Sequence, residues 1–149
     1  MISEKKAYIF GAIFSLANRL QILGDKIDPN ITIKQWLFIA VLMQTEEKDA
    51  TISRLASLIG YSRQNVKKMA VILEKNGFVE FCKDVNDERI LRLKVTQKCY
   101  EYFSGRGQIE EEFISKLFND FSDELIYNIF DGFKSLENNI IIMENENER

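Results

Sequence analysis

A run of hydrogen-bonding side chains begins at Ser62, directly after a Gly60-Tyr61 dipeptide, and its residue types suit the edges of DNA bases. Arginine pairs with guanine, glutamine and asparagine pair with adenine, and lysine neutralises backbone phosphates. A serine at the start of a helix can also offer its hydroxyl or its backbone N–H to a phosphate. The candidate DNA-binding residues in this run are Ser62, Arg63, Gln64, Asn65, Lys67 and Lys68.

These polar residues share a predicted helix with an apolar stripe that must face a core. The stripe has the 3.6-residue period of an α-helix and comprises Val66, Met69, Ala70 and Leu73. A similar stripe precedes it between residues 52 and 59, and Gly60 suits the left-handed position that ends a helix. Two short helices joined in this way predict a helix-turn-helix, which places the start of its second helix in the major groove. A solvated helix face has the same polarity, so the pattern alone leaves both interpretations open.

The period then changes from helical to alternating, which indicates a β-hairpin. Residues 78–83 and 90–95 have apolar side chains at every second position, and the six residues 84–89 between them are polar and rich in turn formers. Arg89 near the tip of this hairpin can enter a narrow minor groove, whose negative potential attracts arginine. Asp87, two residues earlier, can hold the Arg89 guanidinium by charge-assisted hydrogen bonds. Asp87 and Arg89 therefore join the candidate DNA-binding residues.

Long helices are predicted on both sides of this region. Residues 4–26 are apolar around most of the helix circumference, which requires burial on more than one side. A helix that starts after Thr96 is expected to be interrupted near Gly105, and a last helix opens at Ser122 or Asp123. Terminal helices of this kind in a chain of 149 residues indicate burial against a partner subunit. The predicted fold class is mostly α with a β wing, in a single domain.

The net charge of −3 conceals an uneven distribution. Residues 51–98 carry ten Lys or Arg and five Asp or Glu, a net charge of +5, whereas residues 99–149 carry four and twelve, a net charge of −8. The basic middle of the chain can approach phosphates, although charge runs are often no more than solvated faces.

The composition also excludes several classes of chemistry. The absence of histidine excludes catalytic arrangements with a histidine base and metal sites with histidine ligands. The two cysteines are too few for a disulfide framework, which indicates a reducing cytoplasm. An apolar run follows Lys5-Lys6 as in a signal peptide, but the pattern continues past Arg19 as in a packed helix. We therefore expect a cytoplasmic protein that is not an enzyme and needs no cofactor or metal.

An ordered set of segments resembles the MarR (multiple-antibiotic-resistance regulator) family, and the Asp-x-Arg element at residues 87–89, together with its upstream aspartate, is its most diagnostic part. The matching segments are Ile31-Thr32-Ile33-Lys34-Gln35-Trp36, Ser53-Arg54-Leu55-Ala56-Ser57-Leu58-Ile59-Gly60, Ser62-Arg63-Gln64-Asn65-Val66, Leu73-Glu74-Lys75-Asn76-Gly77-Phe78-Val79, Asp84-Val85-Asn86-Asp87-Glu88-Arg89 and Leu93-Lys94-Val95-Thr96. The long flanking helices also fit, so the resemblance covers nearly the whole chain.

The resemblance implies a winged helix-turn-helix homodimer that binds a pseudo-palindromic operator on double-stranded DNA and most often represses transcription. It implies that residues 1–30 and 104–149 form the dimerisation helices and that residues 31–103 form the DNA-binding region. The chain departs from the family pattern at two positions. Cys99 replaces a usual glycine, so the start of the helix after Thr96 is expected to differ locally, and Glu88 replaces an often basic wing residue, which weakens phosphate attraction.

Family members also bind small molecules between the dimerisation helices and the DNA-binding region, so the resemblance implies an apolar or aromatic effector. Candidate lining residues are Tyr8, Phe14, Trp36, Phe38, Tyr100 and Phe103. Aromatic residues at helical spacing are more often core residues, and that alternative stays open for each of the six.

Two further interpretations remain. Cys82 and Cys99 suggest a redox sensor. Of the two, Cys99 lies near a helix start beside Lys98, an environment that can lower the pKa of a thiol. Peroxide-sensing relatives, however, carry their reactive cysteine in the first helix, which has none here. The alternative function is a winged-helix module that binds protein or RNA, because a fold does not determine a function. The combination of base-reading residues 63–65 with Arg89 favours DNA.

Overall fold

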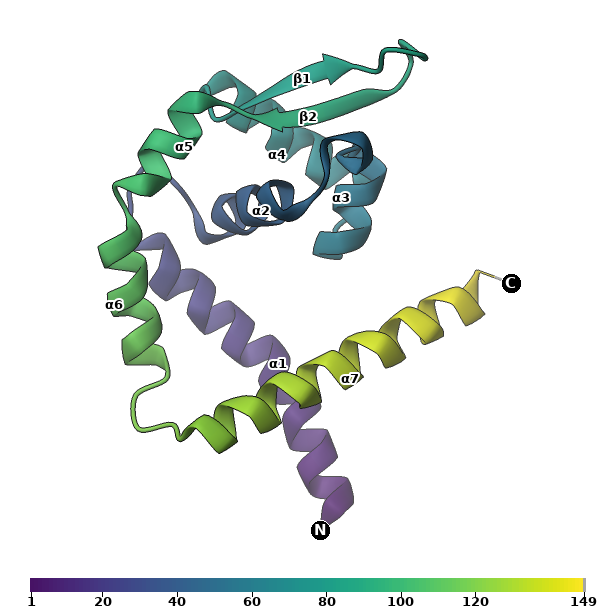
Figure 1. Ribbon diagram of the computed structural model, residues 1–149. Helices are drawn as coiled ribbons and strands as arrows, with labels where there is room; N and C mark the ends of the chain where they lie inside the picture. The colour runs from purple at the N-terminus through teal and green to yellow at the C-terminus, as the bar shows by residue number, and fades with distance from the viewer. Residues whose placement is uncertain (149) are drawn as a thin grey trace. The chain divides into compact units, whose positions relative to one another are not determined.

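The computed structural model describes residues 1–148, which form two compact units, residues 1–107 and residues 108–148. The first contains α1 (Ile2–Asp25), α2 (Ile33–Gln44), the short 3₁₀ helix η1 (Glu47–Asp49), α3 (Ile52–Ile59), α4 (Arg63–Lys75), β1 (Val79–Lys83), β2 (Leu91–Val95) and α5 (Gln97–Ser104). Then come α6 (Gly107–Leu117), which begins at the unit boundary, and α7 (Asp123–Asn147) (Figure 1). Within residues 1–148, no helix is long and apolar enough to cross a membrane.

Hydroxyl side chains start most of these helices. In each case the hydroxyl oxygen accepts the backbone N–H of the residue three positions later, which satisfies a donor that the first helical turn leaves unpaired. These capping residues are Thr32, Thr51, Ser62, Thr96 and Ser122. At α2 the Gln35 side chain also accepts the Thr32 N–H and completes a capping box. The predicted break near Gly105 is confirmed, because α5 ends at Ser104 and α6 begins at Gly107.

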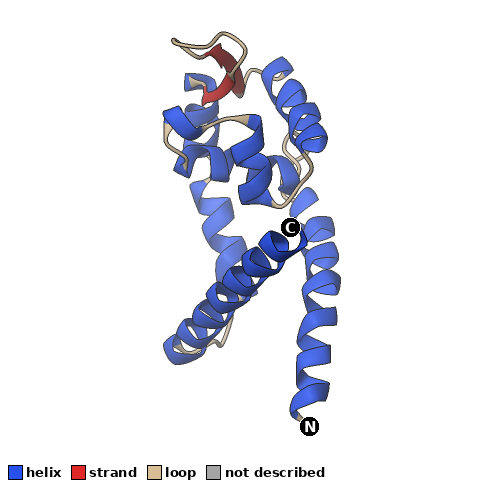
Figure 2. Ribbon diagram, turned by 90° about the vertical axis from the view of Figure 1, so that its right-hand side faces the viewer, coloured by secondary structure: helices blue, strands red, loops and turns tan. Residues whose placement is uncertain are grey.

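The predicted hairpin is confirmed as an antiparallel two-stranded sheet, in which Val79 pairs with Val95 and Phe81 with Leu93. Its loop covers residues 84–90 rather than 84–89, because Ile90 accepts the Asp84 N–H and donates to the Asp87 carbonyl instead of entering β2. The strands lie at one end of the first unit, with the loop extending beyond the helices (Figures 1 and 2). A single residue of the α2–α3 connection, Thr51, bridges to Arg92 on the free edge of β2.

The hydrophobic core lies in the first unit, among α2, α3, α4, α5 and the hairpin. It buries Ile31, Phe38, Ile39, Leu42, Ala50, Leu55, Ala56, Val66, Ala70, Leu73, Phe78, Val79, Leu93 and Cys99. This core fixes the helix-turn-helix and the hairpin to each other, because α3, α4, β1 and β2 all contribute side chains to it. The first unit is therefore a winged helix, and its exposed α4 face and hairpin loop have defined positions.

Candidate nucleic-acid interface

The turn between α3 and α4 has the geometry that its sequence predicts. Gly60 adopts a left-handed backbone conformation, with φ of 81°, which a residue without a side-chain Cβ tolerates best. The Ser62 hydroxyl oxygen then accepts the Asn65 N–H at 3.2 Å and starts α4. Because this turn is closed by local hydrogen bonds, the first residues of α4 are presented at the surface in a fixed orientation.

The α4 helix buries one side and exposes the other. Val66, Ala70 and Leu73 are completely buried, and Met69 packs against the same core. The six candidate residues from Ser62 to Lys68 are all exposed, as their positions off this stripe predict. The helix therefore presents donors, acceptors and positive charge along its first two turns, which is the surface that a major groove requires.

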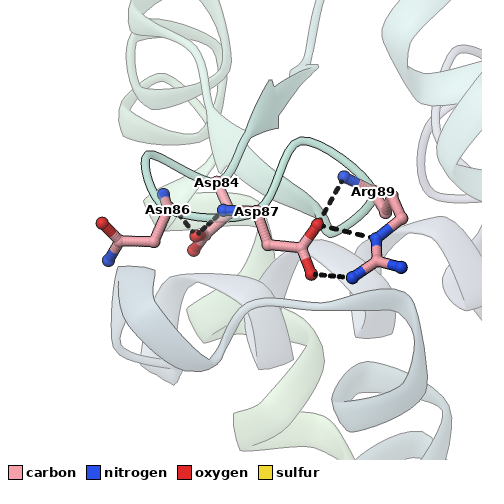
Figure 3. Close-up of polar contacts among 4 residues, drawn as sticks. All are labelled: Asp84, Asn86, Asp87 and Arg89. Atoms are coloured by element: carbon pink, nitrogen blue, oxygen red, sulfur yellow. Dashed lines mark hydrogen bonds and ion pairs between the residues drawn. The ribbon is translucent and has the colours of Figure 1, made fainter.

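The hairpin loop holds Arg89 through Asp87, as the sequence predicts (Figure 3). The Arg89 Nε donates to Asp87 Oδ1 at 3.0 Å and Nη2 donates to Oδ2 at 3.1 Å, in a bidentate pair. Arg89 hydrogen bonding lowers the pKa of Asp87, and the same bonds raise the pKa of Arg89, so both groups stay charged at neutral pH. The Arg89 side chain nevertheless remains 90% exposed, so its guanidinium is oriented and still accessible.

A second aspartate, Asp84, organises the first half of the loop and was not among the candidate DNA-binding residues. Its Oδ1 accepts the backbone N–H groups of Asn86 at 2.8 Å and Asp87 at 2.9 Å (Figure 3). These two backbone donors, Asn86 first, lower the pKa of Asp84, and the Arg92 guanidinium adds to the effect. The spacing of Asp84 two residues before Asn86 is a local signal for such a turn.

Arg92 and Glu74 connect the hairpin to the helices, and sequence reasoning assigned neither of them a role. Arg92 pairs with Asp84 and donates from Nε to the Lys48 carbonyl at 2.8 Å. The Glu74 carboxylate, near the end of α4, accepts the Phe81 N–H at 3.2 Å. The Lys48 contact spans 44 residues, and no periodic or local pattern reveals a pairing of that length.

The six candidate ligand residues differ widely in their surroundings. Phe38 is completely buried in the core, whereas Tyr8, Phe14 and Tyr100 are exposed by more than half. Trp36 and Phe103 are partly buried and pack against the core. A groove of about 320 Å³ between the start of α2 and α4 includes Asn65, Lys68 and Met69 in its lining but none of these six aromatic side chains.

Cys99 does not have the environment of a reactive thiol. It is completely buried at the start of α5, and burial raises the pKa of its thiol to about 11. Lys98 points away to the Asn76 carbonyl at 2.7 Å and over the Phe78 ring. Thr96 caps the Cys99 N–H at an ordinary 3.2 Å, so α5 begins with a normal hydroxyl cap, and the expected difference from the family at this helix start stays a prediction.

The comparisons with known proteins agree with this geometry. Residues 31–91 match the family model described as MarR family. The chain contains a MarR family domain. The transcriptional repressor MprA of Escherichia coli K12 is 35% identical over 72 residues, which are 47% of this chain and 41% of MprA. The match thus spans less than half the length of this curated relative.

Solved structures extend the similarity of the MarR family domain to most of the chain. A MarR/EmrR family regulator from Acinetobacter sp. ADP1 has a TM-score of 0.80 at 20% identity, covering 91% of this chain and 96% of the regulator. MepR of S. aureus, solved as a DNA complex, has a TM-score of 0.72 at 17% identity. The similarity covers 87% of this chain and 94% of MepR. These likenesses establish the winged helix-turn-helix fold, in which α3 and α4 form the helix-turn-helix and β1–β2 form the wing.

Proposed function

We propose that this protein is a sequence-specific DNA-binding transcription regulator, acting as a repressor on a pseudo-palindromic operator. The observation that carries the proposal is the exposed polar face at the start of α4 together with an oriented, accessible Arg89 on the wing. The α4 face suits the major groove, and the wing arginine suits the adjacent minor groove. The relatives support the same class, since MprA is a transcriptional repressor and MepR was solved bound to DNA.

Fluorescence anisotropy with duplex DNA from upstream of the protein's own gene tests this proposal. We expect tight binding that prefers this duplex over a scrambled duplex of the same composition. We also expect log Kd to depend linearly on log salt, because each neutralised phosphate releases counterions with a slope near 0.9. Absence of binding to either duplex at low salt would contradict the proposal and favour a module that binds protein or RNA.

We further propose that the regulator is a homodimer formed by residues 1–30 and 104–149. On α1, the rings of Phe10 and Phe14 pack edge to face with their centroids 5.2 Å apart, and both rings are largely exposed. On α7, Phe130, Phe133 and Ile140 are likewise exposed by more than half. Apolar side chains exposed in such numbers on a soluble protein indicate a surface that another chain covers, and a second copy presents the same apolar faces. The two DNA-binding regions of the dimer would then match the two halves of a pseudo-palindrome.

The double variant Phe14→Glu/Phe133→Glu is expected to convert the dimer into a monomer, because two carboxylates per subunit would be buried without partners. Light scattering after size-exclusion chromatography measures the mass, and circular dichroism confirms that the helices persist. Val85→Glu is the matched control, since Val85 is a fully exposed apolar residue on the wing. A double variant with the mass of a dimer would place the interface elsewhere.

The last part of the proposed function is regulation by an apolar or aromatic effector. Trp36 fluorescence is the signal expected to report its binding. This part rests on the family resemblance, because the six aromatic candidates are divided between the core and the surface. It stays a prediction.

A further inference from the structure

Arg92 lies at the base of the wing and makes two directional contacts. Its Nε donates to the Lys48 carbonyl at 2.8 Å, and Nη1 pairs with the Asp84 carboxylate. The Arg92 and Asp84 side chains are only 24% and 17% exposed, so solvent screens this pair less than it screens a surface ion pair. Lys48 belongs to η1, in the connection between α2 and α3, so Arg92 joins the wing to the segment that leads into the helix-turn-helix.

The contacts of Arg92 continue through the wing loop to Arg89. Asp84, which Arg92 holds through one carboxylate oxygen, accepts the Asp87 N–H with the other. Asp87 in turn accepts the Arg89 backbone N–H at 3.1 Å. Its two carboxylate oxygens also accept hydrogen bonds from Nε and Nη2 of the Arg89 guanidinium. A continuous path of hydrogen bonds thus runs from the Lys48 carbonyl to the exposed guanidinium of Arg89.

Neighbouring contacts fix the same edge of the wing. The Leu93 N–H donates to the Ala50 carbonyl at 2.8 Å, and Lys94 pairs with Glu47 at 3.5 Å. Arg92 differs from Lys94 in a useful respect, because the Lys94 side chain is half exposed and makes no contact with the wing loop among the described contacts. The two residues carry the same charge on the same strand, but only Arg92 reaches the loop that carries Arg89.

We propose that Arg92 is a positioning residue for DNA recognition, which orients the wing so that Arg89 reaches the minor groove. The inference rests on the proposed DNA-binding function and adds a residue that acts through another. Arg92 itself need not touch DNA, since its contacts lie within the protein and its side chain is largely covered. The predicted signature is that the effect of Arg92 on DNA affinity depends on the presence of Arg89.

A double-mutant cycle with Arg92→Gln and Arg89→Ala tests this dependence on the duplex that the wild-type protein prefers. Each single variant is expected to lose roughly tenfold in affinity, the range for one specific arginine contact. The double variant is expected to lose no more than Arg89→Ala alone, because a misplaced arginine and an absent one are equivalent. Multiplied losses in the double variant, or an unchanged affinity in Arg92→Gln, would overturn the proposal.

Two further variants separate positioning from charge. Lys94→Gln removes the same charge from the same strand and is expected to change affinity much less than Arg92→Gln. Arg92→Lys keeps the charge but cannot make both directional contacts, so it is expected to behave like Arg92→Gln. Full rescue by lysine would overturn the proposal in favour of direct phosphate attraction. Wild-type protein that binds no DNA would refute the proposed function itself, whereas wild-type binding that Arg89→Ala leaves intact would refute only the role of the wing.

Discussion

The variant Asn65→Ala is expected to lose most of its preference for the operator, at a cost of roughly 1–3 kcal/mol on the cognate duplex and much less on scrambled DNA. Asn65 is exposed in the first turn of α4, where its amide can pair with an adenine edge in the major groove. Its backbone N–H, not its side chain, takes part in the Ser62 cap, so alanine leaves the helix start intact. Anisotropy titrations of both duplexes at one salt concentration measure the change in preference.

Lys68→Ala is the matched comparison on the same helix, because Lys68 suits a phosphate rather than a base. It is expected to weaken binding to both duplexes equally and to reduce the salt slope by about one. Arg63→Ala is expected to behave like Asn65→Ala, since arginine reads guanine. Equal losses for Asn65→Ala on cognate and scrambled DNA would contradict its assignment as a base-reading residue.

The parts of the fold that follow from short-range chemistry could be predicted from the sequence. The Thr32–Gln35 capping box, the left-handed Gly60 and the Ser62 cap each depend on residues within three positions of one another. The Asp87–Arg89 pair spans two positions and was predicted for the same reason. Such contacts form whenever the local backbone adopts its helix or turn conformation, so the spacing of the residues is enough to predict them.

Contacts between distant segments could not be predicted in this way. Arg92 meets the Lys48 carbonyl across 44 residues, and the Tyr102 hydroxyl donates to Asp28 across 74. Sequence periodicity assigns a residue to a face of its own element but does not say which other segment covers that face. The contacts of Arg92 at the base of the wing were therefore missed, although the Asp87–Arg89 pair in the wing loop was predicted.

Two aromatic residues of a single helix show again that the sequence does not reveal what covers a side chain. Trp36 and Phe38 are two positions apart on α2, and both were candidates for a ligand pocket as well as for the core. In the structure Phe38 is completely buried beside Ile39 and Leu42, whereas Trp36 is only partly buried. An apolar ring is stabilised equally by a core and by a ligand pocket, so its chemistry does not decide between them.

Phe38→Ala is expected to lower the free energy of unfolding by about 3–5 kcal/mol, because it removes a fully buried ring and leaves a cavity in the core. Tyr100→Ala, at a half-exposed position on α5, is the control and is expected to change stability by less than about 1 kcal/mol. Urea unfolding of both variants at one fixed protein concentration measures the difference, since assembly contributes to apparent stability.

The size of this loss decides how the effector hypothesis should be pursued. A loss of several kcal/mol would make Phe38 a core residue, whose variants alter DNA affinity only by unfolding the domain that holds α4 and the wing. A small loss would mean that the surroundings of Phe38 tolerate a void, as the wall of a ligand pocket does. The search for an effector would then begin at α2, with Trp36 fluorescence as the signal two residues away.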